Sequence, residues 1–432
     1  MMSGENALRI AIVGLGTVGG GVIRLLETNR DLITRRAGRP ITITAISARD
    51  RTKDRGVDLS PYEWVDDMSE LAGREEIDAI VELIGGADGP ALTLARQCLA
   101  ARKPFITANK AMIAHHGIDL AGQAEKAAVA LKYEAAVAGG IPVIKGLREG
   151  AAANAISRVY GILNGTCNYI LTTMEKEGHP FADVLKDAQE LGYAEADPTF
   201  DIDGIDAAHK LSILASLSFG AAIAFDQVDV TGIRHVIAAD IAEAAALGFR
   251  IRLVGMAETG EDGLFQRVHP MLVPANHPLS HVDGSLNAVV AEGNFVGRLF
   301  FQGAGAGDGP TASAVVADLI DVARGEYGPA FGMPVDSLDR LPKGDAGKRT
   351  GRVYLRFKVK DRPGVLAEIA AATRDAGVSI ESMIQRGESS NGGVLVVIVT
   401  HAGALACVTD TLTRLRGSDS LLEEPMVMHI LD

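Results

Sequence analysis

The stretch Ile10-Ala-Ile-Val-Gly14-Leu-Gly16-Thr-Val-Gly19 joins a short apolar run to the beginning of a helix, and its pattern decides the fold of the first part of the chain. Gly14 permits a tight turn, Gly16 lets the backbone approach a pyrophosphate, and Gly19 lets the helix pack closely. The N–H groups at the helix start then face the anion. A glycine-rich turn without a ligand is the alternative, but the strand–turn–helix context favours a dinucleotide-binding loop. The candidate contacts are Gly14, Leu15, Gly16, Thr17, Val18 and Gly19.

Apolar strands and helices alternate around this loop through residue 150. Continuous apolar strands that alternate with helices indicate a parallel sheet covered on both faces. We therefore expect an α/β fold with a Rossmann-type dinucleotide-binding domain over residues 1–150. The expected strands are 10–13, 41–47, 77–83, 104–107 and 129–133, and the expected helices include 90–102 and 114–126.

The end of the second expected strand bears on the choice of dinucleotide. An NAD-selective fold usually places a carboxylate there, where it binds the ribose 2′-hydroxyl. This chain has Arg49 at that place, no carboxylate before Asp50, and Lys53 nearby. Arg49 is either a contact for a 2′-phosphate or an ordinary solvated loop charge. The sequence therefore favours NADP and leaves NAD open.

Length and composition exclude several classes of protein. The 432 residues suffice for about three domains at roughly 150 residues each. Hydrophobic residues make up 47% and charged residues 22%, which is enough apolar material for large cores and excludes disorder as the main character. The formal net charge of -13 argues against nucleic acid or an anionic membrane surface as the main partner.

Cysteine usage and apolar stretches indicate the compartment. Cys98, Cys167 and Cys407 lie far apart, which argues against a disulfide framework or a thiolate zinc site and fits a reducing environment. No signal peptide is expected. The longest apolar stretch, 211–225, contains serines and is shorter than the roughly 18–20 residues that span a bilayer. We expect a buried helix there and a soluble cytoplasmic protein.

The pattern changes after residue 150. Successive helices followed by strands predict an α+β second domain over residues 151–303. The expected helices are 166–175, 181–191 and 205–219, and the expected strands are 250–257, 265–272, 288–292 and 298–301. A further long helix is expected over 310–324, with a proline at its start.

The last part of the chain predicts a linker and a small third domain. Residues 340–352 are rich in Gly, Lys and Arg and lack periodicity, which favours a solvated hinge over an anion-binding patch. Apolar residues at every second position from Val353 to Val359 then predict a half-buried strand. The expected order over 353–432 is βαββαβ, a ferredoxin-like unit.

A second constellation lies between residues 192 and 210, where five carboxylates precede one lysine. The pattern becomes helical from residue 205, so Asp206 and Lys210 share one face. A lysine at the edge of a buried helix is well placed to lie in a cleft and to have a tuned pKa. The alternative is an acidic loop that caps the helix, with a surface ion pair. The spacing lacks the twelve-residue pattern of a calcium loop.

Four further stretches make a resemblance specific. They are Thr107-Ala-Asn-Lys110, Gly161-Ile-Leu-Asn-Gly-Thr166-Cys-Asn-Tyr-Ile170, Leu191-Gly-Tyr-Ala-Glu195 continuing to Lys210, and Gly303-Ala-Gly-Ala-Gly307. With the glycine loop they resemble homoserine dehydrogenase over about residues 1–340 and in the right order. The run Asp361-Arg-Pro-Gly-Val-Leu366 resembles the ACT domain, a regulatory module often appended to this enzyme. Nothing here resembles an aspartate kinase, so the resemblance is to the monofunctional form.

The resemblance implies an NAD(P)H-dependent oxidoreductase that interconverts L-aspartate 4-semialdehyde and L-homoserine in threonine, methionine and isoleucine biosynthesis. The implied catalytic residues are Lys210, Asp206 and Lys110. Lys210 would donate the proton that the developing alkoxide needs. Asp206 would hold this lysine, and Lys110 would lie between nicotinamide and substrate. The implied substrate-binding residues are Glu195, Asp201, Asp206, Gly165 and Thr166.

The same resemblance implies further cofactor contacts at Lys110, Gly192, Gly305 and Gly307. It implies a monovalent cation site, with Na⁺ as the expected ion, at Glu134, Val137, Gly139 and Ile141. Residues 151–303 would bind substrate and form a homodimer or homotetramer, and 304–339 would complete the nucleotide domain. Cys167 departs from the threonine more often expected at its position. We interpret it as a small packing substitute, because hydride transfer needs no nucleophile.

Effectors of ACT domains commonly bind between paired domains near the first strand–helix turn. The candidate effector residues are Asp361, Gly364, Val365 and Leu366, with Gly377 facing them, and the expected effector is threonine. The alternative is a domain that only dimerises or has lost its ligand. Two other functions remain open: a Rossmann dehydrogenase for a different amino-acid aldehyde or keto acid, and a catalytically silent nucleotide-binding sensor. Replacement of Lys210 discriminates between catalysis and sensing.

Overall fold

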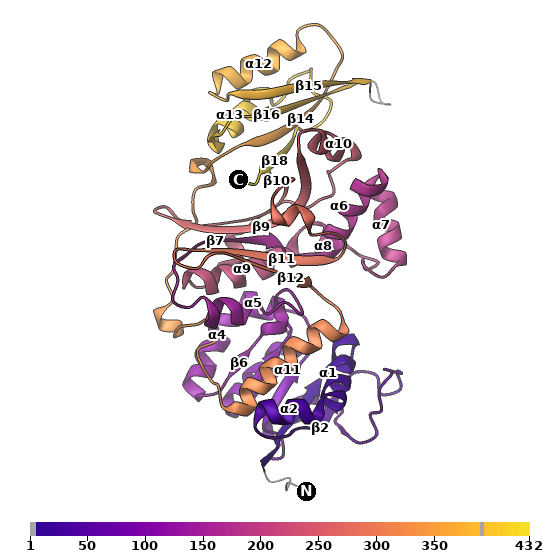
Figure 1. Ribbon diagram of the computed structural model, residues 1–432, viewed down its shortest axis with the longest axis vertical. Helices are drawn as coiled ribbons and strands as arrows, with labels where there is room; N and C mark the ends of the chain where they lie inside the picture. The colour runs from indigo at the N-terminus through magenta and orange to yellow at the C-terminus, as the bar shows by residue number, and fades with distance from the viewer. Residues whose placement is uncertain (1–5, 389–392) are drawn as a thin grey trace.

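The computed structural model describes residues 6–388 and 393–432, so residues 1–5 of the expected nucleotide domain and 389–392 of the expected ACT domain lie outside it. Figure 1 shows a nucleotide-binding unit at one end of the long axis, a long central sheet, and a small α/β unit at the other end. The predicted fold class is confirmed: a Rossmann-type unit, an α+β unit and a ferredoxin-like ACT unit follow one another.

The nucleotide-binding unit contains a sheet that is parallel throughout, in the order β3-β2-β1-β4-β5-β6. Its strands are β1 (Leu8–Val13), β2 (Ile41–Ser47), β3 (Glu63–Trp64), β4 (Ala79–Glu82), β5 (Phe105–Thr107) and β6 (Leu131–Lys132). Its helices are α1 (Thr17–Thr28), α2 (Arg30–Ala37), α3 (Pro90–Ala100) and α4 (Lys110–Ala127). The strand order reverses between β1 and β4, and a crevice at the carboxyl ends of such strands is the usual dinucleotide site.

Some elements of this unit differ from their predicted bounds. Helix α4 begins at Lys110 and not at residue 114, because the Asn109 side chain accepts a hydrogen bond from the Met112 N–H at 3.1 Å and caps the helix. The short strand β3 and the mostly exposed helix α2 were not predicted, since neither carries a long apolar pattern.

Helix α11 (Asp308–Arg324) lies beside α1, although the whole central unit separates them in sequence; Figure 1 shows the orange helix against the indigo one. The contact is close because α1 carries Gly21, where a Cβ would lie 2.7 Å from the Asp308 carbonyl oxygen. Apolar residues of both helices share one core, among them Val22, Ile23, Ala312, Val315 and Leu319. The chain therefore returns to the nucleotide sheet after the central unit.

The central unit combines helices and long antiparallel strands. Its helices are α5 (Val143–Lys145), α6 (Gly165–Glu177), α7 (Phe181–Glu190), α8 (Thr199–Ile202), α9 (Ile205–Phe219) and α10 (Ala238–Ala246). Its strands are β7 (Ile156–Ile162), β8 (Asp229–Val230), β9 (Phe249–Gly260), β10 (Gly263–Pro274), β11 (Leu286–Gly293) and β12 (Gly297–Ala304). Helix α9 has its predicted bounds and is almost wholly buried. Strand β7 was not predicted, because its burial follows no simple alternation: it lies inside the sheet between β11 and β9.

The ACT unit has the predicted order βαββαβ. It comprises β14 (Val353–Val359), α12 (Val365–Asp375), β15 (Ile380–Glu388), β16 (Val394–Thr400), α13 (Leu405–Leu415) and β18 (Met426–Ile430), with β13 (Thr350–Gly351) and β17 (Gly403–Ala404) as a short outlying pair. Strand β18 also pairs in parallel with β10 of the central unit. The two sheets therefore form one continuous sheet in the order β12-β11-β7-β9-β10-β18-β14-β16-β15.

The prediction that β14 is only half buried is wrong. Tyr354 and Arg356, on the face expected to be solvated, are 0% and 6% exposed. The Tyr354 hydroxyl donates to Asp240 Oδ1 at 2.9 Å, and the Arg356 guanidinium lies 2.9 Å from the same atom. Helix α10, which was not predicted, brings Asp240 against this face of the ACT sheet. Only the tertiary fold reveals that both faces of β14 are covered.

The expected hinge at 340–352 is not freely solvated. The Leu264 N–H of β10 donates to the Pro342 carbonyl at 2.9 Å, and the Gly344 N–H donates to the Leu264 carbonyl at 2.7 Å. Arg349 pairs with Asp262 at 3.0 Å. Arg349 and these backbone hydrogen bonds therefore hold the segment against the acidic end of β9 and β10, while Arg340, Lys343 and Lys348 are exposed to solvent as expected. In the described part of the chain, no helix has the length and apolar character needed to cross a membrane.

Candidate active site

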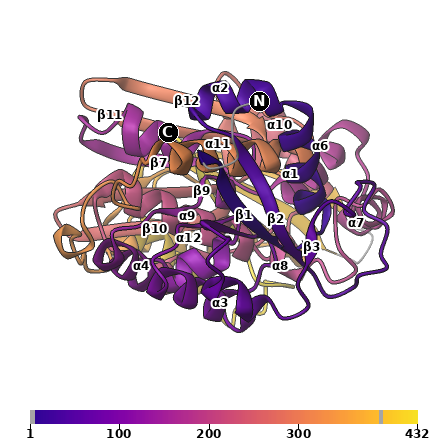
Figure 2. The same ribbon diagram turned by 90° about the horizontal axis from the view of Figure 1, so that it is seen from below.

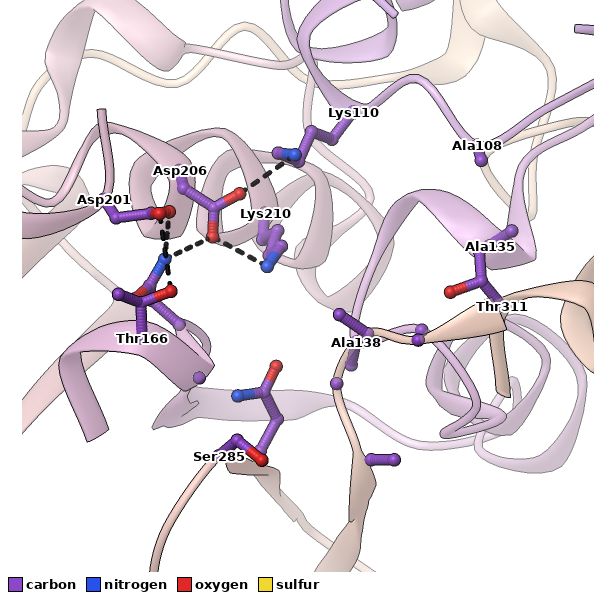
Figure 3. Close-up of a pocket in the computed structure, with 18 of the residues that line it drawn as sticks. Ala108, Lys110, Ala135, Ala138, Thr166, Asp201, Asp206, Lys210, Ser285 and Thr311 are labelled. Carbon is purple, nitrogen blue, oxygen red and sulfur yellow. Dashed lines mark hydrogen bonds and ion pairs between the residues drawn. The ribbon is translucent and has the colours of Figure 1, made fainter. Parts of the chain in front are cut away.

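A cavity of about 530 Å³ lies where the nucleotide-binding unit meets the central unit, and Figure 3 shows its lining. Its walls come from the start of α1, the end of β5, the loop after β6, the starts of α6 and α9, and the segment between β12 and α11. Seen from below in Figure 2, β1, β2 and α1 of the nucleotide unit lie over the central unit. The predicted site residues that line the cavity are Val18, Lys110, Gly139, Gly165, Thr166, Gly192, Asp201, Asp206, Lys210, Gly305 and Gly307.

The glycine loop has the geometry that a dinucleotide needs. Gly14 has a φ of 94°, and a Cβ at Gly19 would lie 2.3 Å from the Gly14 carbonyl oxygen. A Cβ at Gly16, by contrast, would meet no described atom within 4 Å. Among residues 6–388 and 393–432, no side chain caps the N-terminus of α1, which leaves its first N–H groups available to a ligand. The open space at Gly16 and these N–H groups fit a diphosphate.

The acidic residue Asp206, in the first turn of α9, lies between two ammonium groups (Figure 3). Lys210 Nζ lies 2.7 Å from Asp206 Oδ2, and Lys110 Nζ lies 3.0 Å from Oδ1. Lys210 also donates to the Leu163 carbonyl oxygen at 2.8 Å. Asp206 and Lys210 are only 4% and 8% exposed, so the alternative of a surface ion pair is wrong.

The electrostatics keep this cluster ionised. Burial alone would raise the pKa of Asp206, but the ammonium groups of Lys210 and Lys110 outweigh burial and hold that pKa well below its usual range. For Lys110, burial lowers the pKa, but the Asp206 carboxylate outweighs it and the net pKa is raised. At neutral pH the cavity therefore presents a carboxylate and the protonated Lys110 side by side.

Asn164 is a functional candidate that sequence reasoning missed. Its Nδ2 donates to Asp201 Oδ1 at 2.8 Å and to Asp206 Oδ2 at 2.9 Å. Its Oδ1 accepts from the Cys167 N–H at 2.8 Å and caps α6. An asparagine directly before a helix is a common N-cap, which was the available signal. Its second role, the joining of two carboxylates from a distant segment, has no signature in the sequence.

The other acidic residues divide into a lining and a peripheral group. Asp201 lines the cavity, and burial together with the Asp206 carboxylate raises its pKa. Thr166 Oγ1 lies 3.4 Å from Asp201 Oδ2 and donates to the Tyr193 carbonyl oxygen at 2.7 Å. Glu195 is exposed and is not among the residues that line this cavity, although its charge contributes to the raised pKa of Lys110.

Comparison with known proteins finds similarity to homoserine dehydrogenases along nearly the whole chain. Residues 14–134 match the homoserine dehydrogenase NAD-binding domain, 142–320 match homoserine dehydrogenase, and 353–417 match the ACT domain. A homoserine dehydrogenase of Pseudomonas aeruginosa is 43% identical over 421 residues, which is 96% of each chain. A crystal structure of a homoserine dehydrogenase from Thiobacillus denitrificans has a TM-score of 0.92 at 40% identity, covering 99% of this chain and 98% of the other.

The chain belongs to the homoserine dehydrogenase family. It is therefore an NAD(P)-dependent oxidoreductase, as the resemblance implied. A hyperthermophilic archaeal homoserine dehydrogenase in complex with NADPH is a more distant relative, with 27% identity and a TM-score of 0.64 over 75% of this chain and 99% of that one.

Three further expected cofactor residues, Gly192, Gly305 and Gly307, line the same cavity. A Cβ at Gly139 would lie 2.6 Å from the Gly305 carbonyl carbon, so the two loops touch through glycines. Gly192 has a φ of 77° and Gly307 a φ of 119°, which glycine adopts without strain. Arg49 is exposed two residues after β2 and lies outside this cavity, near the strand end where a ribose 2′ group is bound in this fold.

The expected cation residues form one buried loop after β6. Ala138 and Gly139 have φ values of 58° and 54°, which turn successive carbonyls in different directions. Within residues 6–388 and 393–432, no N–H donates to the carbonyls of the buried Val137 or Gly139. Burial raises the pKa of the Glu134 carboxyl to about 7, with the nearby Asp318 adding to the effect. The Ile141 carbonyl, in contrast, accepts from the Val143 N–H at 2.7 Å, and the Glu134 carbonyl accepts from the Val137 N–H at 3.5 Å. Two of the four expected carbonyls, those of Val137 and Gly139, therefore have the unpaired buried oxygens that suit a hard monovalent cation.

Cys167 has the environment expected of a packing residue. Its side chain is 0% exposed, and burial raises the pKa of its thiol. The Sγ donates to the Asp201 carbonyl oxygen at 3.2 Å. A buried thiol with a raised pKa is a poor nucleophile.

Proposed function

We propose that the chain catalyses the reversible NAD(P)H-dependent reduction of L-aspartate 4-semialdehyde to L-homoserine, with Lys210, Asp206 and Lys110 as the catalytic group. The observation that supports this most directly is the lysine–carboxylate–lysine cluster at the cavity wall, in which Asp206 and Lys210 are buried and the Nζ–Oδ distances are 2.7 and 3.0 Å. The family assignment supports the reaction. A bound nicotinamide supplies the hydride, and the protein must supply the proton.

Lys210 is the proton donor in this proposal. An ammonium has three N–H bonds, and Lys210 uses two of them on Asp206 and the Leu163 carbonyl. The third is left for the substrate oxygen, where it can stabilise developing negative charge and transfer a proton. Asp206 holds the ammonium in position, and Lys110 adds a second positive charge.

The two ends of the amino-acid part of the substrate need opposite charges. Gly165 and Thr166 are the first residues of α6, whose N–H groups lack intrahelical acceptors and suit the carboxylate. Asp201 and Asp206 are available for the ammonium. Glu195 would join them if the loop after α7 moved toward the cavity when substrate binds.

The direct test is an assay with L-homoserine and each of NADP⁺ and NAD⁺. We expect turnover with both and a preference for NADP⁺, since Arg49 stands where a 2′-phosphate would lie and an archaeal relative is known in complex with NADPH. Arg49→Ala should raise the KM for NADP⁺ about 10-fold to 100-fold, the range for a lost charge-assisted contact, and leave that for NAD⁺ nearly unchanged. An equal change for both cofactors would contradict this role of Arg49, and no turnover of homoserine would contradict the function.

We further propose that threonine regulates the enzyme through the ACT unit, at Asp361, Gly364, Val365 and Leu366. Asp361, Gly364 and Leu366 are exposed at the turn between β14 and α12, and Val365 packs into the ACT core, which leaves this turn accessible to a paired domain. A route to the catalytic unit exists, because Arg356 and Arg386 of the ACT sheet pair with Asp240 and Glu243 of α10.

Threonine at ten times its Kd should stabilise the protein by ~1.4 kcal/mol and raise Tm, because it binds the native state preferentially. It should also inhibit turnover. Asp361→Ala should reduce both effects, whereas Asp375→Ala, at the far end of α12, should leave them intact. If millimolar threonine produces neither a Tm shift nor inhibition, regulation by threonine is rejected and a purely dimerising ACT domain is favoured.

Two remaining proposals concern the cation and the assembly. We propose that Na⁺ binds the carbonyls of Glu134, Val137, Gly139 and Ile141, which should give a higher Tm in NaCl than in choline chloride of equal ionic strength. We propose a homodimer or homotetramer that uses the β11–β12 hairpin, where Phe295 in the turn is 90% exposed and Phe300 on the edge strand β12 is 38% exposed. Light scattering measures the mass, and a monomer at micromolar concentration would reject this assembly.

A further inference from the structure

Asn287 of β11 is a buried side chain whose polar atoms lack partners. It is 1% exposed, and in the described part of the chain neither Nδ2 nor Oδ1 has a hydrogen-bond partner. Leaving a buried donor or acceptor unpaired costs free energy, and such groups are rare in native proteins. Asn164, in the same cavity, pairs both of its polar atoms. Asn287 also lines the cavity, so a ligand there could supply the missing partners.

The strand places Asn287 at the reacting end of the cavity. Val289 and Ala291, on the same face of β11, belong to the large apolar core, so Asn287 is the polar end of an apolar row. The ladder between β11 and β7 ends at Ala288 and Ile162, which leaves Asn287 one residue beyond it. Leu163, whose carbonyl accepts from Lys210, is also one residue beyond that pair. The side chain therefore lies near the cluster that would hold the substrate aldehyde.

The other side of Asn287 contacts the expected cofactor loops. A Cβ on Gly305 would lie 1.8 Å from Asn287 Oδ1, so only glycine leaves room for this carboxamide. Gly305 in turn contacts Gly139 across the domain junction. The unpaired carboxamide thus lies between the lysine–carboxylate cluster and the glycine-lined part of the cavity.

The missing partner must offer a donor and an acceptor together. A primary carboxamide does so, and two primary carboxamides can form a pair of parallel N–H···O=C bonds. Hydride transfer requires the nicotinamide ring to lie against the substrate carbonyl carbon, and the ring carbon beside the hydride-bearing carbon carries a carboxamide. We propose that Asn287 binds the nicotinamide carboxamide of NAD(P) and fixes the rotation of the ring at the substrate. This inference rests on the proposed function.

The test compares NADP⁺ with its 3-acetylpyridine analogue, which replaces the carboxamide NH₂ by a methyl group. Titration calorimetry in the absence of substrate gives both Kd values. We expect wild type to bind the analogue about 10-fold more weakly than NADP⁺. Asn287→Ala and Asn287→Leu should lose most of the NADP⁺ advantage and bring the ratio of the two Kd values near one. Asn294→Ala, at the exposed turn after β11, should retain the wild-type ratio.

Thermal unfolding separates a cofactor contact from a structural one. Because the Asn287 side chain has no hydrogen-bond partner among the described residues, Asn287→Leu should leave the Tm of the cofactor-free protein unchanged or raised. It should also reduce the Tm increase that NADP⁺ produces. A wild-type ratio near one, or an unchanged ratio in both variants, would overturn the proposal. An unchanged ratio with a raised KM for homoserine would place Asn287 on the amino-acid substrate instead. Absence of homoserine turnover in wild type with an intact Kd ratio would reject the proposed function and leave the cofactor contact standing.

Discussion

Lys210→Ala lowers kcat by ~10²–10⁴ in the expected result, the usual range for loss of a general acid, while the Kd for NADPH stays within a few-fold of wild type. The reason is the position of the ammonium, 2.7 Å from Asp206 and 2.8 Å from the Leu163 carbonyl, with one N–H left for the cavity. In this variant Lys110 still neutralises the charge of Asp206. It lies on the other side of that carboxylate and comes from a different helix, so it cannot donate a proton from the position of Lys210.

The pH dependence of this variant supplies a second measurement. Of the two ammonium groups that lower the pKa of Asp206, Lys210 has the larger effect. Its removal should therefore raise the pKa of Asp206 toward its usual range or above it. Activity that remains in Lys210→Ala should therefore fall at a higher pH than in wild type as the solution is acidified. Lys186→Ala, on the exposed face of α7, is the matched control and should behave as wild type. Near-wild-type turnover in Lys210→Ala would reject the mechanism and favour a sensing function.

Substitution of Gly19 by alanine should have the next largest effect, and it should act on stability and cofactor binding together. The added Cβ would lie 2.3 Å from the Gly14 carbonyl oxygen, a backbone atom that cannot move without opening the turn. Forced overpacking of this kind costs about 1–3 kcal/mol, and the displaced loop should raise the Kd for NADPH by at least about 10-fold. Differential scanning calorimetry and fluorescence titration measure the two effects.

Gly16→Ala separates the two contributions. A Cβ at Gly16 meets no described atom within 4 Å, so the Tm of the cofactor-free protein should stay close to wild type. If the diphosphate approaches this backbone, the Kd for NADPH should nevertheless rise about 10-fold, the cost of roughly one lost close contact. Gly122→Ala, which also has open space but lies in the interior of α4, should leave the Kd unchanged and keep or slightly raise the Tm, because alanine favours a helix over glycine. A normal Kd in Gly16→Ala would show that the phosphates lie elsewhere.

Local patterns predicted most of the fold because the forces involved are local. The glycine loop, the strands around it and helix α9 follow from backbone freedom and apolar periodicity, and α9 has its predicted bounds. Strand β7 was not predicted from the sequence, because an interior strand is stabilised by both neighbouring strands and needs no alternation of apolar and polar residues. The segment 340–352 is more closely held than expected because one of its basic residues, Arg349, pairs with Asp262 and Glu258, which lie far away in sequence.

The candidate site divides in the same way. Asp206 and Lys210 are one helical turn apart, so the sequence by itself determined that they share a face, and the motifs determined the family. Only the tertiary structure decided that this pair is buried, that Lys110 completes it, and that Asn164 joins Asp206 to Asp201. Burial and hydrogen bonding depend on which distant segments pack together, and the unpaired carboxamide of Asn287 emerges only from that packing. Local chemistry thus selects the reaction, and long-range packing decides which polar groups are left to meet the ligand.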